Sequence, residues 1–181
     1  MTNRTEKIPT IIQWLSGGAA VASGFLAMDS LRLFSDAPLL SNIITVQNHY
    51  YYALLGLLLP LCFLIYPTTT NSKSIWLDST LSFLTLSACA FFFINAETML
   101  DYGWEFAAPL HAAWLSFMLW ALILEALRRS GGMVLFILVL LFSLYPMFAD
   151  KLPGSISGMA SSPTETASYH VMSIESILGL P

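Results

Sequence analysis

An uncharged apolar run at residues 131–149 restricts the fold of this chain more than any other feature. At 1.5 Å per helical residue the run would be roughly 28 Å long, about the hydrocarbon thickness of a bilayer. Each Val, Leu, Ile or Phe at the centre of such a run favours membrane insertion by roughly 0.3–0.6 kcal/mol. The run therefore predicts a transmembrane helix.

The rest of the chain has the composition of a membrane protein. Of its 181 residues, 56% are hydrophobic and 10% are charged, and the mean hydropathy is +0.71. Soluble domains carry about 25% charged residues. The few Lys and Arg residues are spread over predicted helix ends and loops without a basic stripe, so we expect no nucleic-acid partner.

Further apolar segments predict an all-α, polytopic integral membrane protein with about five transmembrane helices. We expect a five-helix transmembrane scaffold over residues 1–150 and a periplasmic connector with an amphipathic helix over residues 151–181. The predicted spans are residues 9–34, 47–66, 75–96, 108–129 and 131–149.

The basic residues predict the orientation, because cytoplasmic loops of membrane proteins carry an excess of Lys and Arg. If the N-terminus is cytoplasmic, only Arg32 and Lys151 lie outside. The basic residues on the cytoplasmic side are then Arg4, Lys7, Lys73, Arg128 and Arg129.

Two helix faces are candidate subunit interfaces. Small residues recur every four positions in the first span, which allows another helix to approach closely. Polar residues in the third span fall on one face, which should contact protein rather than lipid. An aqueous path along this face is the alternative. The candidate interface residues are Ser16, Ala20 and Gly24 in the first span, and Asp78, Ser82 and Thr85 in the third.

A cluster of charged residues ends the fourth predicted span. Glu125 lies three and four residues before Arg128 and Arg129, so it can pair with either on one helix face. An arginine at the bilayer centre costs about 2.5–3.5 kcal/mol, so the cluster should mark a membrane face. The following Gly131 and Gly132 predict a tight turn between two helices. We expect Glu125, Arg128 and Arg129 to form a structural polar knot.

The C-terminal tail contains the sequence pattern of a short helix. Ser162 and Glu165 are spaced as a capping box, with Pro163 at the first helical position. Apolar residues such as Ala167 and Val171 follow at helical spacing. Because the segment is short and polar, we expect it to lie against the outer membrane face or a partner protein.

No motif for catalysis or metal binding is present. His49, His111 and His170 do not repeat at metal-ligand spacing, and Cys62 and Cys89 fall inside apolar runs, as packed free thiols do. We therefore expect no enzyme, and no catalytic, substrate-binding or metal-binding residue and no cofactor in this chain.

From residue 51 onward, the order of sequence signals resembles the small membrane component of tripartite ATP-independent periplasmic (TRAP) transporters, in the TAXI branch. Together the segments cover roughly two-thirds of the chain, and Ser176 replaces an expected glycine. The segments are residues 63–67 (FLIYP), Asp78, residues 124–132 (LEALRRSGG), residues 152–154 (LPG) and residues 175–181 (ESILGLP).

This resemblance implies a subunit of the bacterial inner membrane that braces a large, elevator-type transport subunit. A periplasmic TAXI-type solute-binding protein would deliver a small organic anion to the complex. The substrate site and the coupling ion, expected to be Na⁺, would belong to the large subunit. In many TAXI members this region is fused to the large subunit, and the fifth predicted span corresponds to the connecting helix of that arrangement.

Two other functions remain open from the residues alone. One is a small channel or exporter formed by several copies of the chain. The other is a stand-alone membrane enzyme or redox protein, which would need a cofactor or a nucleophile–base pair.

Overall fold

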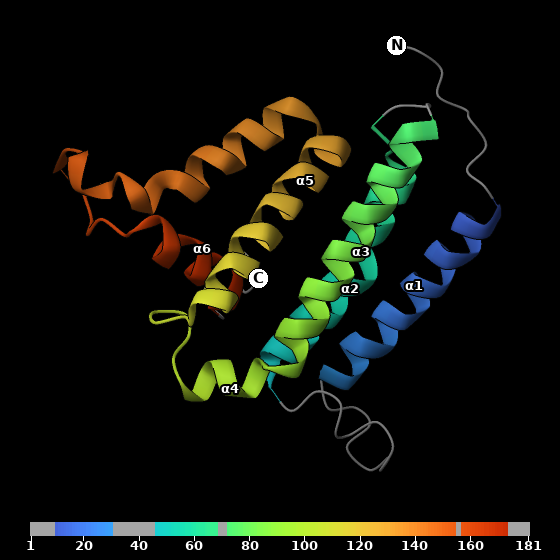
Figure 1. Ribbon diagram of the computed structural model, residues 1–181, viewed down its shortest axis with the longest axis horizontal. Helices are drawn as coiled ribbons and strands as arrows, with labels where there is room; N and C mark the ends of the chain where they lie inside the picture. The colour runs from blue at the N-terminus through green and yellow to red at the C-terminus, as the bar shows by residue number, and fades with distance from the viewer. Residues whose placement is uncertain (1–9, 31–45, 69–71, 155–156, 174–181) are drawn as a thin grey trace.

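The computed structural model describes residues 10–30, 46–68, 72–154 and 157–173, and these residues form an all-α structure with no strand. Helices α1 (Thr10–Ser30), α2 (Gln47–Ile65) and α3 (Ser72–Ile94) run side by side (Figure 1). The short α4 (Ala96–Asp101) then leads into the long α5 (Leu110–Leu144). Two 3₁₀ turns, η1 (Tyr145–Met147) and η2 (Ala149–Lys151), connect α5 to α6 (Pro163–Met172).

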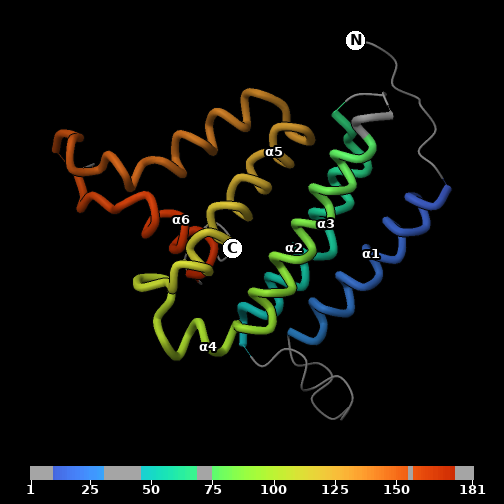
Figure 2. The backbone as a smooth tube through the Cα atoms, viewed as in Figure 1, coloured from blue at the N-terminus to red at the C-terminus, as the bar shows by residue number. Residues whose placement is uncertain are grey.

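Helix α5 is bent sharply at Gly132, where the backbone has φ +80° and ψ 177°. We call residues 110–131 arm 1 and residues 133–144 arm 2; the two arms diverge from the bend (Figure 2). Glycine adopts this conformation readily because it has no Cβ, whereas other residues are strained there. The turn predicted at the glycine pair is therefore confirmed.

Four helices of the described residues are long and apolar enough to cross a membrane, where the sequence predicted about five. The difference lies in α5, which contains the fourth and fifth predicted spans in one bent element. Arm 2 ends as an α-helix at Leu144, five residues before the predicted end of the fifth span. Its twelve residues rise only about 18 Å, which is less than a full bilayer crossing.

The core lies where α2, α3, arm 1 and α6 meet. Tyr52 of α2 stacks on Phe92 of α3 with ring centroids 5.4 Å apart, and both side chains are buried with Leu119 of arm 1. Helices α2 and α3 approach closely at Gly56, where an added Cβ would lie 3.1 Å from the Cβ of Cys89. Outside this core, large apolar side chains are exposed, as expected for surfaces that face lipid.

Helix α6 forms as the sequence predicted and packs against other helices of the chain. The capping box is confirmed: Ser162 Oγ accepts from the backbone N–H of Glu165 at 3.2 Å, and the Glu165 carboxylate accepts from Ser162 N–H at 2.8 Å. The helix ends at Met172 and packs against α5 and the start of α2 of its own chain, with Ala167 and Val171 buried. One face of α6 thus packs within the chain, and its expected contact with the outer membrane face or a partner protein stays a prediction.

The molecule has two ends, which agree with the predicted alternation of the helices. The bend of α5, the end of α2 and the start of α3 lie together, and we call this the bend end (Figure 1). Helix α4, the start of α2 and the start of arm 1 lie at the other end, which we call the α4 end. The sequence predicts that the bend end is cytoplasmic.

Candidate functional site

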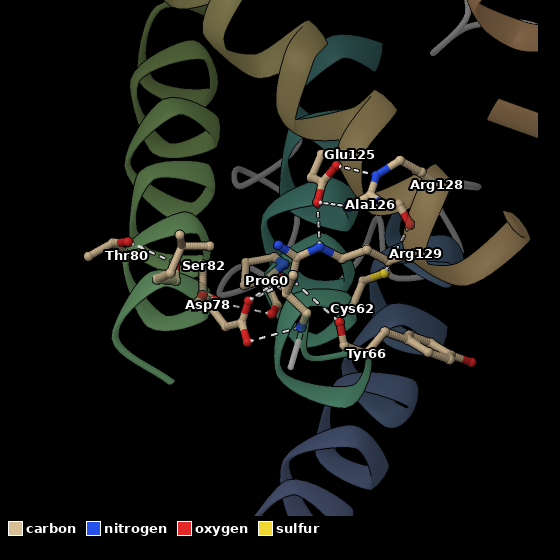
Figure 3. A network of polar contacts seen from close by, with 12 residues as sticks. Pro60, Cys62, Tyr66, Asp78, Thr80, Ser82, Glu125, Ala126, Arg128 and Arg129 are labelled. Carbon is tan, nitrogen blue, oxygen red and sulfur yellow. Dashed lines mark hydrogen bonds and ion pairs between the residues drawn. The ribbon is translucent and has the colours of Figure 1, made fainter. Parts of the chain in front are cut away.

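The charged residues of the bend end form one network across three helices (Figure 3). Arm 1 supplies Glu125, Arg128 and Arg129 from adjacent turns. Helix α3 supplies Asp78 from its first turns, and the end of α2 supplies the carbonyl of Tyr66.

Arg129 is the centre of this network. Its Nη1 donates to Asp78 Oδ1 at 2.6 Å, and its Nε donates to Glu125 Oε1 at 2.7 Å. The Arg129 and Asp78 side chains are 5% and 4% exposed. Charge-assisted hydrogen bonds of this length are among the strongest in proteins. Because both side chains are buried, dissolved salt weakens their attraction only slightly.

Arg128 closes the outer side of the network. Its Nε and Nη2 donate to the two oxygens of Glu125, each at 2.7 Å, in a bidentate pair that remains partly exposed. The predicted polar knot of Glu125, Arg128 and Arg129 is therefore present. Two carboxylates face two guanidinium groups, so the formal charges cancel.

Neutral groups complete the surroundings of the buried pair. Asp78 also accepts from the backbone N–H and the hydroxyl of Thr68 at 3.4 and 3.3 Å. Arg129 donates to the Tyr66 carbonyl at 3.4 Å, and its guanidinium lies 5.0 Å from the centre of the Phe63 ring. The network thus fastens the residues that follow α2 to α3 and α5.

The sequence predicted the Arg129–Glu125 contact but not the Asp78–Arg129 pair. Helical spacing brings Glu125 and Arg129 together, whereas Asp78 is 51 positions away from Arg129 in the sequence. The sequence did contain a signal for this pair, because Asp78 and Arg129 have opposite charges and both fall at ends of predicted spans on the same predicted side of the membrane.

The polar face of α3 makes contacts within its own chain. Ser82 Oγ bonds to the Pro60 carbonyl of α2 at 3.0 Å and to the Asp78 carbonyl at 2.9 Å. Thr85 is fully buried and donates to the Leu81 carbonyl of its own helix at 2.8 Å. Asp78, Ser82 and Thr85 thus contribute to a seam within the chain. Their predicted role at a subunit interface stays a prediction.

The small-residue face predicted for α1 remains at the surface. Ala20 and Gly24 are exposed, and Ser16 is half-buried and bonds to the Gln13 carbonyl of its own helix at 2.9 Å. The buried residue of α1 is Ala19, so the face toward α2 lies beside the predicted stripe. Contact of the stripe with a partner subunit stays a prediction.

The histidines make hydrogen bonds and ring contacts, and the cysteines are not paired with each other. His49 Nδ1 accepts from Val46 N–H at 3.3 Å, and His111 lies beside two aromatic rings. Cys62 and Cys89 are free thiols, as predicted. Within the described part of the chain, no group of three or more His, Cys, Asp or Glu side chains could hold a metal ion.

Comparisons with models of protein families, with curated proteins and with solved structures find no match to this chain.

Proposed function

We propose that this chain is the small scaffold subunit of a TRAP-type secondary transporter of the TAXI branch, in the bacterial inner membrane. It braces a large elevator-type transport subunit, which imports a small organic anion delivered by a periplasmic solute-binding protein. The substrate and the coupling Na⁺ bind the large subunit, and this chain holds neither.

One observation carries the proposal: three segments on which the family resemblance rests lie together at the bend end. Residues 63–67 supply Phe63 and Tyr66, which contact Arg129. Asp78 pairs with Arg129, and residues 124–132 supply the rest of the network. Residues that lie far apart in the sequence thus form one unit that fastens three helices.

The chemistry of this unit favours a scaffold over a pathway. Charged residues within membrane segments usually mark ion or substrate routes, because leaving them unpaired is costly. Here Arg129 and Asp78 are nearly fully buried and bonded to each other and to further groups. Such a closed network stabilises helix positions and leaves no charge directed toward a transported solute.

The proposal is tested by co-expression with the polytopic protein encoded by the neighbouring reading frame and with a periplasmic receptor from the same locus. We expect this chain to co-purify with the larger protein. Reconstituted liposomes should take up a labelled organic anion only when both membrane chains are present. Equal uptake without this chain would contradict the proposal, and flux through this chain alone would favour the channel alternative.

A charge-reversal variant separates bracing from substrate recognition. Arg128→Glu with Arg129→Glu places two additional negative charges beside Asp78 and Glu125, so insertion or assembly should fall. The solutes accepted by any complex that still forms should be unchanged. Altered selectivity at normal expression would contradict a pure scaffold role.

A further inference from the structure

Arm 2 of α5 and helix α6 each end with carbonyl groups that have no partner in their own helix. The last four carbonyls of any α-helix lack intrahelical donors. In a membrane, water does not replace those donors, so each unsatisfied group costs several kcal/mol. In this chain, side chains from other elements donate to three of these carbonyls, those of Ser143, Val171 and Met172.

The end of arm 2 is held at Ser143. The Ser143 carbonyl lies 2.7 Å from His170 Nε2 of α6. Because a carbonyl oxygen only accepts, the imidazole must carry its hydrogen on Nε2. The buried Ser143 hydroxyl accepts from Trp120 Nε1 of arm 1, also at 2.7 Å. Ser143 therefore joins arm 2 to both arm 1 and α6.

The end of α6 is held by α2 in the same way. Tyr52 Oη donates to the Val171 carbonyl at 2.8 Å, and Asn48 Nδ2 donates to the Met172 carbonyl at 3.3 Å. Both side chains are buried. Helix α6 thus lies in a chain of contacts that runs from α2 to the end of arm 2, in the opening between the two arms (Figure 2).

Arm 2 has much of its surface open. Val134, Leu141 and Phe142 are among its exposed side chains, and its buried residue is Ser143. The contacts at Ser143 lie at the end of arm 2 that is farthest from Gly132. Contacts at that distance from the bend restrict the angle of the arm most strongly.

We propose that α6 is a clasp that fixes the direction of arm 2 relative to the helix bundle. Tyr52 and Asn48 anchor the clasp on α2, and His170 holds arm 2 through the Ser143 carbonyl. When the anchor on α2 is weakened, α6 loosens and arm 2 becomes free to move about Gly132.

The test is hydrogen–deuterium exchange on the full chain in lipid nanodiscs, comparing Tyr52→Phe with the unmodified protein. This variant keeps the buried ring and removes only the hydroxyl that donates to Val171. The loss of one hydrogen bond should speed exchange about threefold to tenfold at the amides it protects. We expect this increase in α6, which Tyr52 contacts, and also in the last turn of arm 2, which is connected to Tyr52 through α6.

Tyr51→Phe is the matched control, because the Tyr51 hydroxyl accepts from Gln47 of its own helix at 2.8 Å and has no part in the clasp. It should leave exchange in arm 2 unchanged. Faster exchange in α6 alone after Tyr52→Phe would overturn the proposal, because arm 2 would then keep its position when α6 loosens.

His170→Phe tests the other end of the clasp and serves if Tyr52→Phe does not fold. It keeps a ring beside Trp120 and removes the Nε2 donor to the Ser143 carbonyl, so exchange in the last turn of arm 2 should speed up. Unchanged exchange in arm 2 would also overturn the proposal. Both measurements use this chain alone, so they stand apart from the proposed transport role.

Discussion

Arg129 determines how three helices are joined, because its guanidinium donates to groups on α2, α3 and α5. Such a residue is costly to bury and costly to remove. Its desolvation is offset only while both Asp78 and Glu125 accept from it. The neighbouring Arg128 has the same charge, but its side chain is 38% exposed and it pairs with Glu125 on its own helix.

We therefore expect Arg129→Gln to lower the free energy of unfolding by about 3–5 kcal/mol, because it leaves the Asp78 carboxylate buried without its cation. Arg128→Gln should cost about 1 kcal/mol or less, as for exposed ion pairs. Equilibrium unfolding in mixed detergent micelles measures both values. Adding Asp78→Asn to Arg129→Gln should recover part of the loss, and equal costs for the two single variants would argue against the buried pair.

Gly56 gives a second residue-scale prediction. An alanine Cβ there would lie 3.1 Å from Cys89 Cβ, so α2 and α3 must separate to admit it. Gly56→Ala should therefore destabilise the protein by about 1–3 kcal/mol. Gly24→Ala is the matched control in α1, where nothing lies within 4 Å. It should be neutral or stabilising by up to about 1 kcal/mol. Equilibrium unfolding in mixed detergent micelles measures both variants. An unchanged free energy of unfolding for Gly56→Ala would contradict the close approach of α2 and α3.

At the scale of elements, α5 shows how a local conformation sets a long-range direction. Apolar residues continue through the glycine pair, so composition alone would permit one straight helix of 35 residues. The positive φ at Gly132 turns the chain instead, and the contacts of Ser143 then hold arm 2 in place.

Replacing Gly132 with alanine should cost about 1–3 kcal/mol, because its backbone lies in a region that residues with a Cβ avoid. Gly18→Ala is a suitable control, since Gly18 has a helical backbone and open space around it. Thermal unfolding of both variants in detergent checks the difference. A Gly132→Ala protein as stable as Gly18→Ala would show that the bend tolerates other residues.

At the scale of the whole molecule, the helices have one polar network at the bend end, a second group of polar contacts around α6, and many exposed apolar side chains. The network at the bend end and the proposed clasp formed by α6 fasten different sets of helices. Together they join α2, α3, α5 and α6 through polar contacts between residues far apart in the sequence.

The predicted orientation belongs to this scale. A cysteine introduced at exposed Ser130, near the bend, should react with an impermeant thiol reagent only from the cytoplasmic side. A cysteine at exposed Asp101, in α4, should react only from outside. Right-side-out and inverted vesicles expose the outer and the cytoplasmic face to the reagent, respectively. The unmodified chain measures the background labelling of the native thiol of Cys62. Labelling from the opposite sides would reverse the orientation given by the basic residues.

The sequence by itself determined the membrane class, the helical segments, the Glu125–Arg129 spacing, the turn at the glycine pair and the capping box of α6. These features depend on hydrophobicity, helical periodicity and side chains within four residues of one another, all of which are local.

Only the tertiary structure decided which faces meet. It paired Asp78 with Arg129, turned Ala19 rather than Ala20 toward α2, and placed α6 against Tyr52 and Ser143. The physical reason is that a membrane helix gains no hydrophobic energy by choosing one apolar neighbour over another or over lipid. Close packing and the need of each buried polar group for a partner make that choice, and both depend on residues far apart in the chain.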